Sequence, residues 1–181
     1  NKGESIISID GSKCKLEENM LVIADTEGPV AIAGVMGGLD TEISEASTNV
    51  LLKDASFDPV CVRSTARKLA LPSEAAFRFE RFVDTEKIEW ASQRTAELIL
   101  QVAGGKIVEG IVDAWPTKSE TQTVGMRTTR LEKLLGIKID KKEIMQIFDR
   151  LGFAPQEKQP DLIVCTVPSW RHDIYREADL I

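Results

Sequence analysis

Apolar runs in the first third of the chain are short and end in turn residues. Residues 21–24 read Leu-Val-Ile-Ala and precede the turn sequence Asp-Thr-Glu-Gly-Pro at 25–29. A second run begins at Val30 and ends at Gly37 and Gly38. Short apolar runs bounded by glycine, proline and aspartate are typical of strands. We therefore predict a hairpin followed by a tight turn.

The two glycines and the next apolar run extend this picture. Gly37 and Gly38 can form a turn with positive φ, or they can let a ligand approach the main chain closely. Residues 49–52, Asn-Val-Leu-Leu, predict a third strand, after which charged and small residues replace the apolar run.

Helical signals dominate the middle of the chain. Asp58 and Pro59 are typical of an N-cap and a first helical position, and the helix that they predict extends to about Leu69. After a loop at 70–74, apolar residues at helical spacing predict a longer helix that stops at Gly104. These apolar positions are Ile88, Ala91, Leu98, Ile99 and Val102. We expect this face to pack against the sheet.

The segment 113–123 is polar and broken by proline, which is the composition of a linker between compact units. We therefore expect two domains, residues 1–116 and residues 117–181. In the second, residues 128–135 predict a short helix that ends at Gly136.

A second helix of this domain is predicted from Asp140 to Gly152, with a start that resembles a capping box. Its apolar residues at helical spacing are Ile144, Ile147, Phe148 and Leu151. Residues 162–168 then predict a strand. Two short helices in tandem indicate a helix-turn-helix-like, winged-helix-like unit. We expect an α+β chain, with a mixed sheet packed with helices in the first domain.

Composition limits the class of protein. With 43% hydrophobic and 29% charged residues, the 181-residue chain can bury a core. No apolar run reaches the roughly eighteen residues of a membrane span, and the start at 1–4 lacks signal-peptide features, so we expect a cytoplasmic protein without a membrane partner. Three cysteines, Cys14, Cys61 and Cys165, and one histidine argue against a disulfide framework or a zinc site.

Net charge restricts the nucleic-acid interpretation. The formal charge of −6 is unfavourable for a free-standing nucleic-acid binder, so any RNA contact must be local. Three clusters could supply a local basic surface, or they could be ordinary solvated helix faces. They are Arg63, Arg67 and Lys68; Arg78 and Arg81; and Arg127, Arg130 and Lys133.

A series of motifs in one order carries a family resemblance. Those of the first half are Ala33-Gly34-Val35-Met36-Gly37-Gly38, Phe57-Asp58-Pro59, Arg63-x-Thr65-Ala66-Arg67-x-Leu69, and Arg78-Phe79-Glu80-Arg81 with Val83-Asp84. Those of the second half are Leu134-Leu135-Gly136, Leu151-Gly152-Phe153, Val167-Pro168-Ser169-Trp170-Arg171-x-Asp173-Ile174 and Glu177-x-Asp179-Leu180-Ile181. The chain resembles the beta chain of bacterial-type phenylalanyl-tRNA synthetase, from its editing domain into the small domain that follows.

The resemblance implies a role in a heterotetramer of two alpha and two beta chains that attaches phenylalanine to tRNA(Phe) with ATP and Mg²⁺. In this family the alpha chain performs the charging reaction, and the editing domain of the beta chain hydrolyses Tyr-tRNA(Phe). A second site that hydrogen-bonds the hydroxyl can select tyrosine strongly, whereas a pocket shaped for phenylalanine rejects it only modestly. The resemblance also implies that this segment alone is inactive and holds no cofactor.

The resemblance further implies an editing pocket lined by Ala33, Gly34, Ser73 and Ala75. By their residue types alone, Ala33 and Gly34 could equally be packing residues, and Ser73 could be a turn or cap residue. No side chain is an obvious nucleophile, so we assign no catalytic residue. We expect water to attack the ester, guided by positioning and backbone hydrogen bonds.

One further pocket position departs from the family pattern. Where the family usually carries a glutamate that can accept a bond from the tyrosine hydroxyl, this chain has Lys53, with Asp54 beside it. A charged lysine cannot accept a hydrogen bond. Either Asp54 replaces the glutamate, or the specificity is altered, or editing is weak. The family also often has a histidine at the position of Pro72 and a glycine at that of Phe82.

Asp173 and Asp179 match two family carboxylates of a magnesium site. Two aspartates six residues apart are a weak site by themselves, and by residue type alone they would be surface residues. We expect no ordered magnesium on this segment. Two other function classes stay open, an assembly module without activity and a nucleic-acid-binding module. The acidic charge and the lack of a basic recognition helix favour the first of these.

Overall fold

The computed structural model describes residues 3–118 and 120–181, which belong to two compact units. The first unit ends at Val108 and the second begins at Glu109, and the boundary predicted after residue 116 lies eight residues later. Ser119, within the predicted linker, lies outside the described residues, as do the first two residues. Both units contain helices and antiparallel strands, so the predicted α+β class is confirmed.

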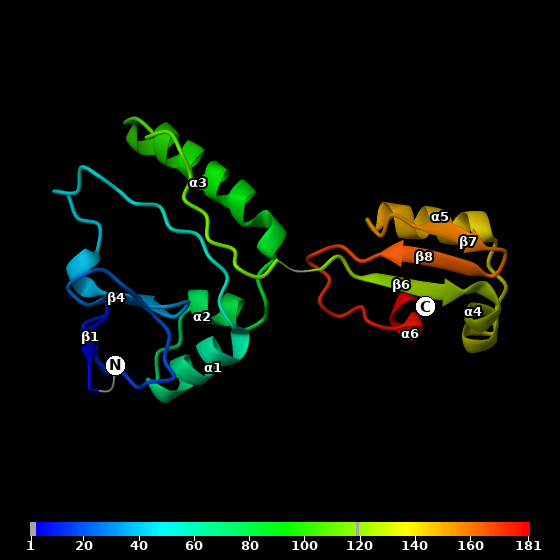
Figure 1. Cartoon of the computed structure of the whole chain (residues 1–181), viewed down its shortest axis with the longest axis horizontal. Helices are drawn as coiled ribbons and strands as arrows, with labels where there is room; N and C mark the ends of the chain where they lie inside the picture. Colours follow the sequence, from blue (N-terminus) through cyan, green and yellow to red (C-terminus); the bar gives the residue numbers. More distant parts are fainter. Residues whose placement is uncertain (1–2, 119) are drawn as a thin grey trace. The chain divides into compact units, whose positions relative to one another are not determined.

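The first unit combines two small sheets with three helices (Figure 1). Its strands are β1 (Ser5–Ile7), β2 (Lys13–Lys15), β3 (Val22–Ala24), β4 (Pro29–Ile32) and β5 (Met36–Gly37). Its helices are α1 (Pro59–Lys68), α2 (Glu74–Phe79) and α3 (Ile88–Ala103), with the 3-10 turns η1 (Leu39–Thr41) and η2 (Thr85–Lys87). β1 pairs with β2, and β4 pairs with both β3 and β5. The predicted hairpin is therefore confirmed.

The core of this unit lies between the strands and the inner faces of α1 and α2. Asp58 caps α1 by accepting a hydrogen bond from the Cys61 amide at 2.7 Å, as its N-cap position predicts. Val62 and Thr65, on one face of α1, are buried. The buried apolar residues that pack together in this core are Ile6, Cys14, Leu16, Met20, Ile32, Val35, Val62, Leu71 and Ala76.

Two expectations for the first unit are wrong. Residues 49–52 do not form a strand, and Leu51 is 94% exposed. A strand needs a neighbour that satisfies its backbone groups, and no described strand pairs with this run. The long helix α3 forms as predicted, with Gly104 as its C-cap, but none of its residues is buried and Val102 is 84% exposed. Its apolar face does not pack against a sheet of this unit.

The second unit places helices around a three-stranded antiparallel sheet of order β6-β8-β7. Its elements are β6 (Thr123–Arg127), α4 (Thr128–Leu135), α5 (Lys141–Arg150), β7 (Gln156–Gln159), β8 (Leu162–Thr166) and α6 (Glu177–Leu180). Both predicted helices are confirmed, with Gly136 left-handed after α4 and Asp140 capping α5. The predicted strand is also confirmed, although it stops at Thr166. The winged-helix arrangement stays a prediction.

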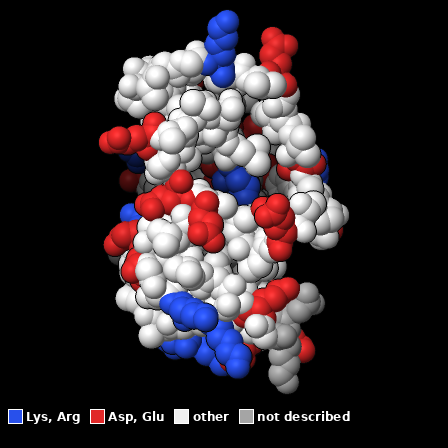
Figure 2. Space-filling view, turned by 90° about the vertical axis from the view of Figure 1, so that its left-hand side faces the viewer, with Lys and Arg blue, Asp and Glu red and all other residues white. Residues whose placement is uncertain are grey.

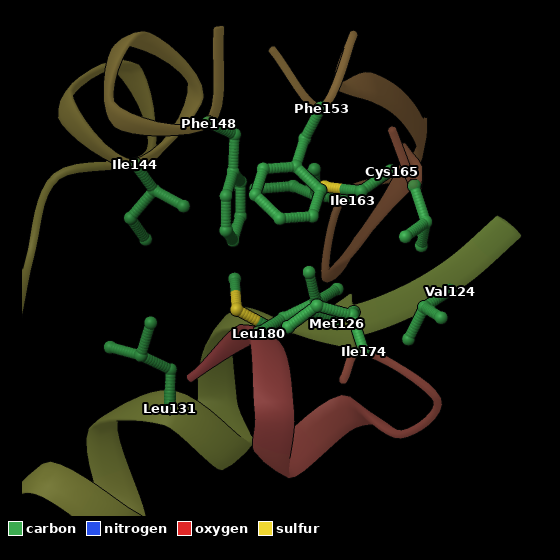
Figure 3. Packing of buried hydrophobic residues seen from close by; sticks show 11 residues of the cluster. Val124, Met126, Leu131, Ile144, Phe148, Phe153, Ile163, Cys165, Ile174 and Leu180 are labelled. Carbon is green, nitrogen blue, oxygen red and sulfur yellow. The ribbon is translucent and has the colours of Figure 1, made fainter. Parts of the chain in front are cut away.

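Eleven side chains from every layer of this unit form its core (Figure 3). Figure 3 shows Ile144 and Phe148 reaching inward from α5 and Leu131 from α4, with Met126 on the sheet between them. The rings of Phe148 and Phe153 meet edge to face, with centroids 5.9 Å apart. This core holds the two helices on the sheet.

The three cysteines are free thiols, of which Cys14 and Cys165 are buried and Cys61 is half-buried. Burial raises the pKa of the Cys165 thiol to about 11. Among the described residues, no helix combines the length and the apolar character that a membrane crossing requires.

Candidate functional site

A pocket of about 470 Å³ lies in the first unit, within the range of small-ligand sites. Its walls come from β3, β4 and β5, from the irregular segment before α1, from α2, and from η2 and the start of α3. Most of these residues are apolar. The charged lining residues are Lys53, Asp54, Asp84 and Lys87. An apolar chamber with a few charged groups suits a ligand that is mainly hydrophobic and carries one or two polar atoms.

The turn between β4 and β5 forms one wall of the pocket. Gly34 has a φ of +69°, and a Cβ there would lie 2.9 Å from Val62 and 3.0 Å from Phe57. Only glycine fits, because these side chains pack directly against the main chain of Gly34, which also lines the pocket. Gly37 and Gly38 do not have positive φ. Gly38 is required by close packing, because a Cβ there would lie 2.6 Å from the Val30 carbonyl oxygen.

Four of the six predicted pocket residues line this pocket, namely Gly34, Lys53, Asp54 and Ala75. Ala33 does not line it and is buried, with 3% of its surface exposed. Ser73, in the loop predicted at 70–74, also stands outside the lining and is the N-cap of α2. Its hydroxyl accepts from the Ala76 amide at 3.0 Å and donates to the Val35 carbonyl at 2.6 Å. Ser73 therefore ties the start of α2 to the glycine turn.

Lys53, which departs from the family pattern, and its neighbour Asp54 differ in their surroundings. Lys53 is exposed as a residue, yet its Nζ lies 4.4 Å from the centroid of the Phe57 ring. Burial of the ammonium lowers the pKa of Lys53, and the nearby Asp54 carboxylate partly opposes this shift. Oδ2 of Asp54 is fully buried and accepts no hydrogen bond from any described residue. Because an unsatisfied buried acceptor costs about 1–3 kcal/mol, this oxygen is suited to a ligand donor.

Several lining residues had no role assigned from the sequence. Phe57 and Phe79 occur in the motifs that carry the resemblance, but neither was assigned to the pocket. They stand together in its wall with ring centroids 5.0 Å apart. Asp84 lines the pocket while its carboxylate accepts from the Glu86 amide at 3.2 Å, as the cap of η2. The residue type of Asp84 is typical of a helix cap, so this role was readable in the sequence. The approach of Phe57 and Phe79 to Gly34 was not.

The two predicted metal ligands are held by other partners. Asp173 accepts two hydrogen bonds from the Arg171 guanidinium, both at 2.8 Å, which lower the pKa of Asp173 to about 2. Asp179 accepts from the amides of Tyr175 and Arg176 at the start of α6. Within the part of the chain that the structure describes, no three acidic, histidine or cysteine side chains converge on a possible metal site. These residues do not by themselves fit a magnesium ion.

Another carboxylate of the second unit has a structural role that the sequence did not reveal. Glu177 accepts from the Arg127 amide at 2.8 Å and from its guanidinium at 3.0 and 2.7 Å. Arg130 adds an ion pair at 3.2 Å. The bonds from Arg127 lower the pKa of Glu177 to about 2. Glu177 thus joins α6 to the junction of β6 and α4.

Two models of known families match the chain, one in each compact unit. The family model of the B3/4 domain matches residues 1–104, and that of the tRNA synthetase B5 domain matches residues 124–181. The chain is 42% identical over 174 residues to the phenylalanine–tRNA ligase beta subunit of Salinibacter ruber. This chain belongs to the phenylalanyl-tRNA synthetase beta-chain family. The alignment covers 96% of the chain and 21% of that relative.

Other members of the beta-chain family match equally fully. The beta subunit of Rhodopirellula baltica is 42% identical over 98% of the chain and 26% of its own length. That of Geobacter metallireducens is 40% identical over 99% of the chain and 22% of its own length. The chain therefore spans about a fifth to a quarter of the curated relatives that it matches.

Phe82 adopts a left-handed backbone with a φ of +68°. A non-glycine residue in this region costs about 1–2 kcal/mol. We expect Phe82→Gly to raise the free energy of unfolding of the first unit by about 1 kcal/mol, after the loss of ring contacts is allowed for. Urea unfolding measures this change. A loss of stability would show that the contacts of the half-exposed Phe82 ring outweigh its backbone strain.

Proposed function

We propose that this chain is the editing and B5 segment of a phenylalanine–tRNA ligase beta subunit, and that its pocket binds the aminoacyl end of Tyr-tRNA(Phe) for hydrolysis. The observation that carries the proposal is the buried, unsatisfied Oδ2 of Asp54 in an aromatic-walled pocket. In the complete enzyme, the beta subunit joins an alpha subunit in an α2β2 assembly that charges tRNA(Phe) with ATP and Mg²⁺ in the cytoplasm.

Recognition of tyrosine follows from the chemistry of a phenol. A hydroxyl donates one hydrogen bond and accepts others. Asp54 Oδ2 accepts from the phenol O–H, and the Lys53 ammonium donates to the phenol oxygen, while Phe57 and Phe79 contact the ring. Phenylalanine would occupy the same space but leave Asp54 buried without a partner. A site built to bind a hydroxyl discriminates strongly against a ligand that lacks it.

Hydrolysis then needs only a positioned water. The water oxygen bonds to the ester carbonyl carbon, the bond to the ribose oxygen breaks, and the proton lost by the water is taken up by the released ribose oxygen, which becomes a hydroxyl. The main chain at Gly34, which lines the pocket, holds the aminoacyl group close to the wall. No lining side chain acts as a nucleophile, so positioning supplies the rate enhancement.

We expect the isolated segment to be inactive. Apolar side chains at Leu51 and Val102 are 94% and 84% exposed, and the pocket-lining residues Lys53, Asp54, Ala55 and Phe57 follow within six residues of Leu51. A pocket wall that follows an uncovered segment is not rigidly held, and catalysis by positioning is sensitive to small displacements. The activity therefore belongs to the complete enzyme.

The test uses the complete enzyme and tRNA(Phe) charged with tyrosine. Asp54→Ala should lower kcat/KM for tyrosine release at least about tenfold, which corresponds to roughly 1.4 kcal/mol of lost transition-state stabilisation. Lys53→Glu should preserve tyrosine release, because it supplies the acceptor that the family usually has. Charging with phenylalanine serves as a readout of folding.

Asp84→Ala is the matched control, because Asp84 lines the same pocket but its carboxylate already caps η2. It should change tyrosine release much less than Asp54→Ala. Unchanged release in Asp54→Ala would refute the acceptor role. An equal loss in both variants would show that any negative charge in the pocket suffices.

A further inference from the structure

The outer face of α1 concentrates positive charge on an acidic chain. Arg63, Arg67 and Lys68 lie on this exposed face, and α1 contains no acidic residue. Val60, Ser64 and the three basic residues line a shallow surface hollow. Figure 2 shows one side of the first unit, where acidic side chains are frequent and basic side chains gather at the lower end.

The arginines of this face differ from the other helical arginines of the first unit. Arg78 pairs with Glu74 in α2, and Arg94 pairs with Glu97 in α3. The guanidinium groups of Arg63 and Arg67, in contrast, form no ion pair or hydrogen bond with any described residue, while Lys68 pairs with Glu17. The helix dipole stabilises a positive charge in the last turn of a helix, which accounts for the presence of Arg67. It does not account for Arg63, which lies in the middle of α1. Two unpaired guanidinium groups one turn apart form a site for an anion with repeated charges.

The inner face of α1, opposite the basic residues, packs against the wall of the pocket. Val62, on the inner face of α1, would contact a Cβ at Gly34, and Phe57, just before the N-cap, lines the pocket. An anion bound to the outer face would therefore be about one helix diameter, roughly 10 Å, from the pocket wall. Residues four apart rise about 6 Å along a helix, so Arg63 and Arg67 can each meet a separate phosphate of one strand.

We infer that the outer face of α1 binds the phosphate backbone of the RNA whose aminoacyl end enters the pocket, with Arg63 and Arg67 as the main contacts. This inference rests on the proposed function for the identity of the RNA. The guanidinium groups position the RNA strand and take no part in ester hydrolysis. They affect substrate binding and leave the chemical step unchanged.

The test compares Arg63→Gln/Arg67→Gln with Arg78→Gln/Arg94→Gln in the complete synthetase. Both double variants remove two exposed positive charges, but only the first removes unpaired ones. The affinity for uncharged tRNA(Phe) is measured over a range of salt concentrations. The slope of log affinity against log salt should become shallower by about 1.4 to 1.8 in the first double variant, as expected for two lost phosphate contacts. The control should retain the slope of the natural protein.

Two hydrolysis assays complete the test. With Tyr-tRNA(Phe), the first double variant should raise KM while kcat stays within about twofold. With tyrosine ethyl ester, which has no phosphate, its rate should equal that of the natural protein. An unchanged salt slope, or an equal change in the control, would overturn the inference. If the natural protein hydrolyses neither ester, the proposed editing function fails, and the salt slope still decides the role of α1.

Discussion

Replacement of Gly34 by alanine should lower the free energy of unfolding of the first unit by about 2–5 kcal/mol. The left-handed φ of +69° costs a side-chain-bearing residue about 1–2 kcal/mol. The new Cβ would also lie 2.9 Å from Val62 and 3.0 Å from Phe57, and overpacking of a filled site costs about 1–3 kcal/mol. The same displacement of Phe57 should distort the pocket, so tyrosine release should fall as well.

Gly11→Ala provides the control for this prediction. Gly11 also has a positive φ, +83°, but a Cβ there would meet no atom within 4 Å. Its substitution should cost about 1–2 kcal/mol, from the backbone alone. Chemical denaturation of both variants measures the difference. Equal losses would mean that the backbone conformation, and not the contact with α1, requires glycine at position 34.

Leu131→Ala should destabilise the second unit by about 2–5 kcal/mol, because it removes a side chain that is 5% exposed and central to the core. Leu134→Ala makes the same chemical change one turn later on α4, where the side chain is 60% exposed. It should cost no more than about 0.5 kcal/mol. Calorimetry on both variants tests the assignment of the inner face. Similar losses would contradict the position of α4 on the sheet.

Helices were predictable from this sequence because their ends carry local chemistry. Asp58 before α1, Gly136 after α4 and Asp140 before α5 satisfy or terminate the backbone within a few residues. The short helix α2 was missed although Ser73 is a good cap, because only six residues follow it.

The prediction of strands depended on information that is not local in the sequence. β7 has four exposed polar residues and no apolar alternation, so nothing in its sequence indicates that it pairs with β8. Residues 49–52 have the opposite character, an apolar run without a partner among the described strands. Pairing decides both cases, and pairing is a property of the folded chain.

The pocket was predictable only in outline. Residues identified through the family pattern, such as Gly34 and Asp54, line it. The unsatisfied Oδ2 of Asp54 could not be foreseen, because it depends on which donors the fold brings near. For Ser73, the cap role that its residue type allowed is the one found in the structure.

The hydroxyl of Ser73 has a mechanical consequence for the pocket. It bonds to the Val35 carbonyl in the glycine turn and to the Ala76 amide in α2. While both bonds hold, the wall that contains Gly34 and the wall that contains Ala75 move as one rigid body. Movement of the pocket wall is then expected mainly in residues 53–57, which have no regular structure. Lys53 and Asp54, which we propose contact the amino acid, belong to this compliant segment.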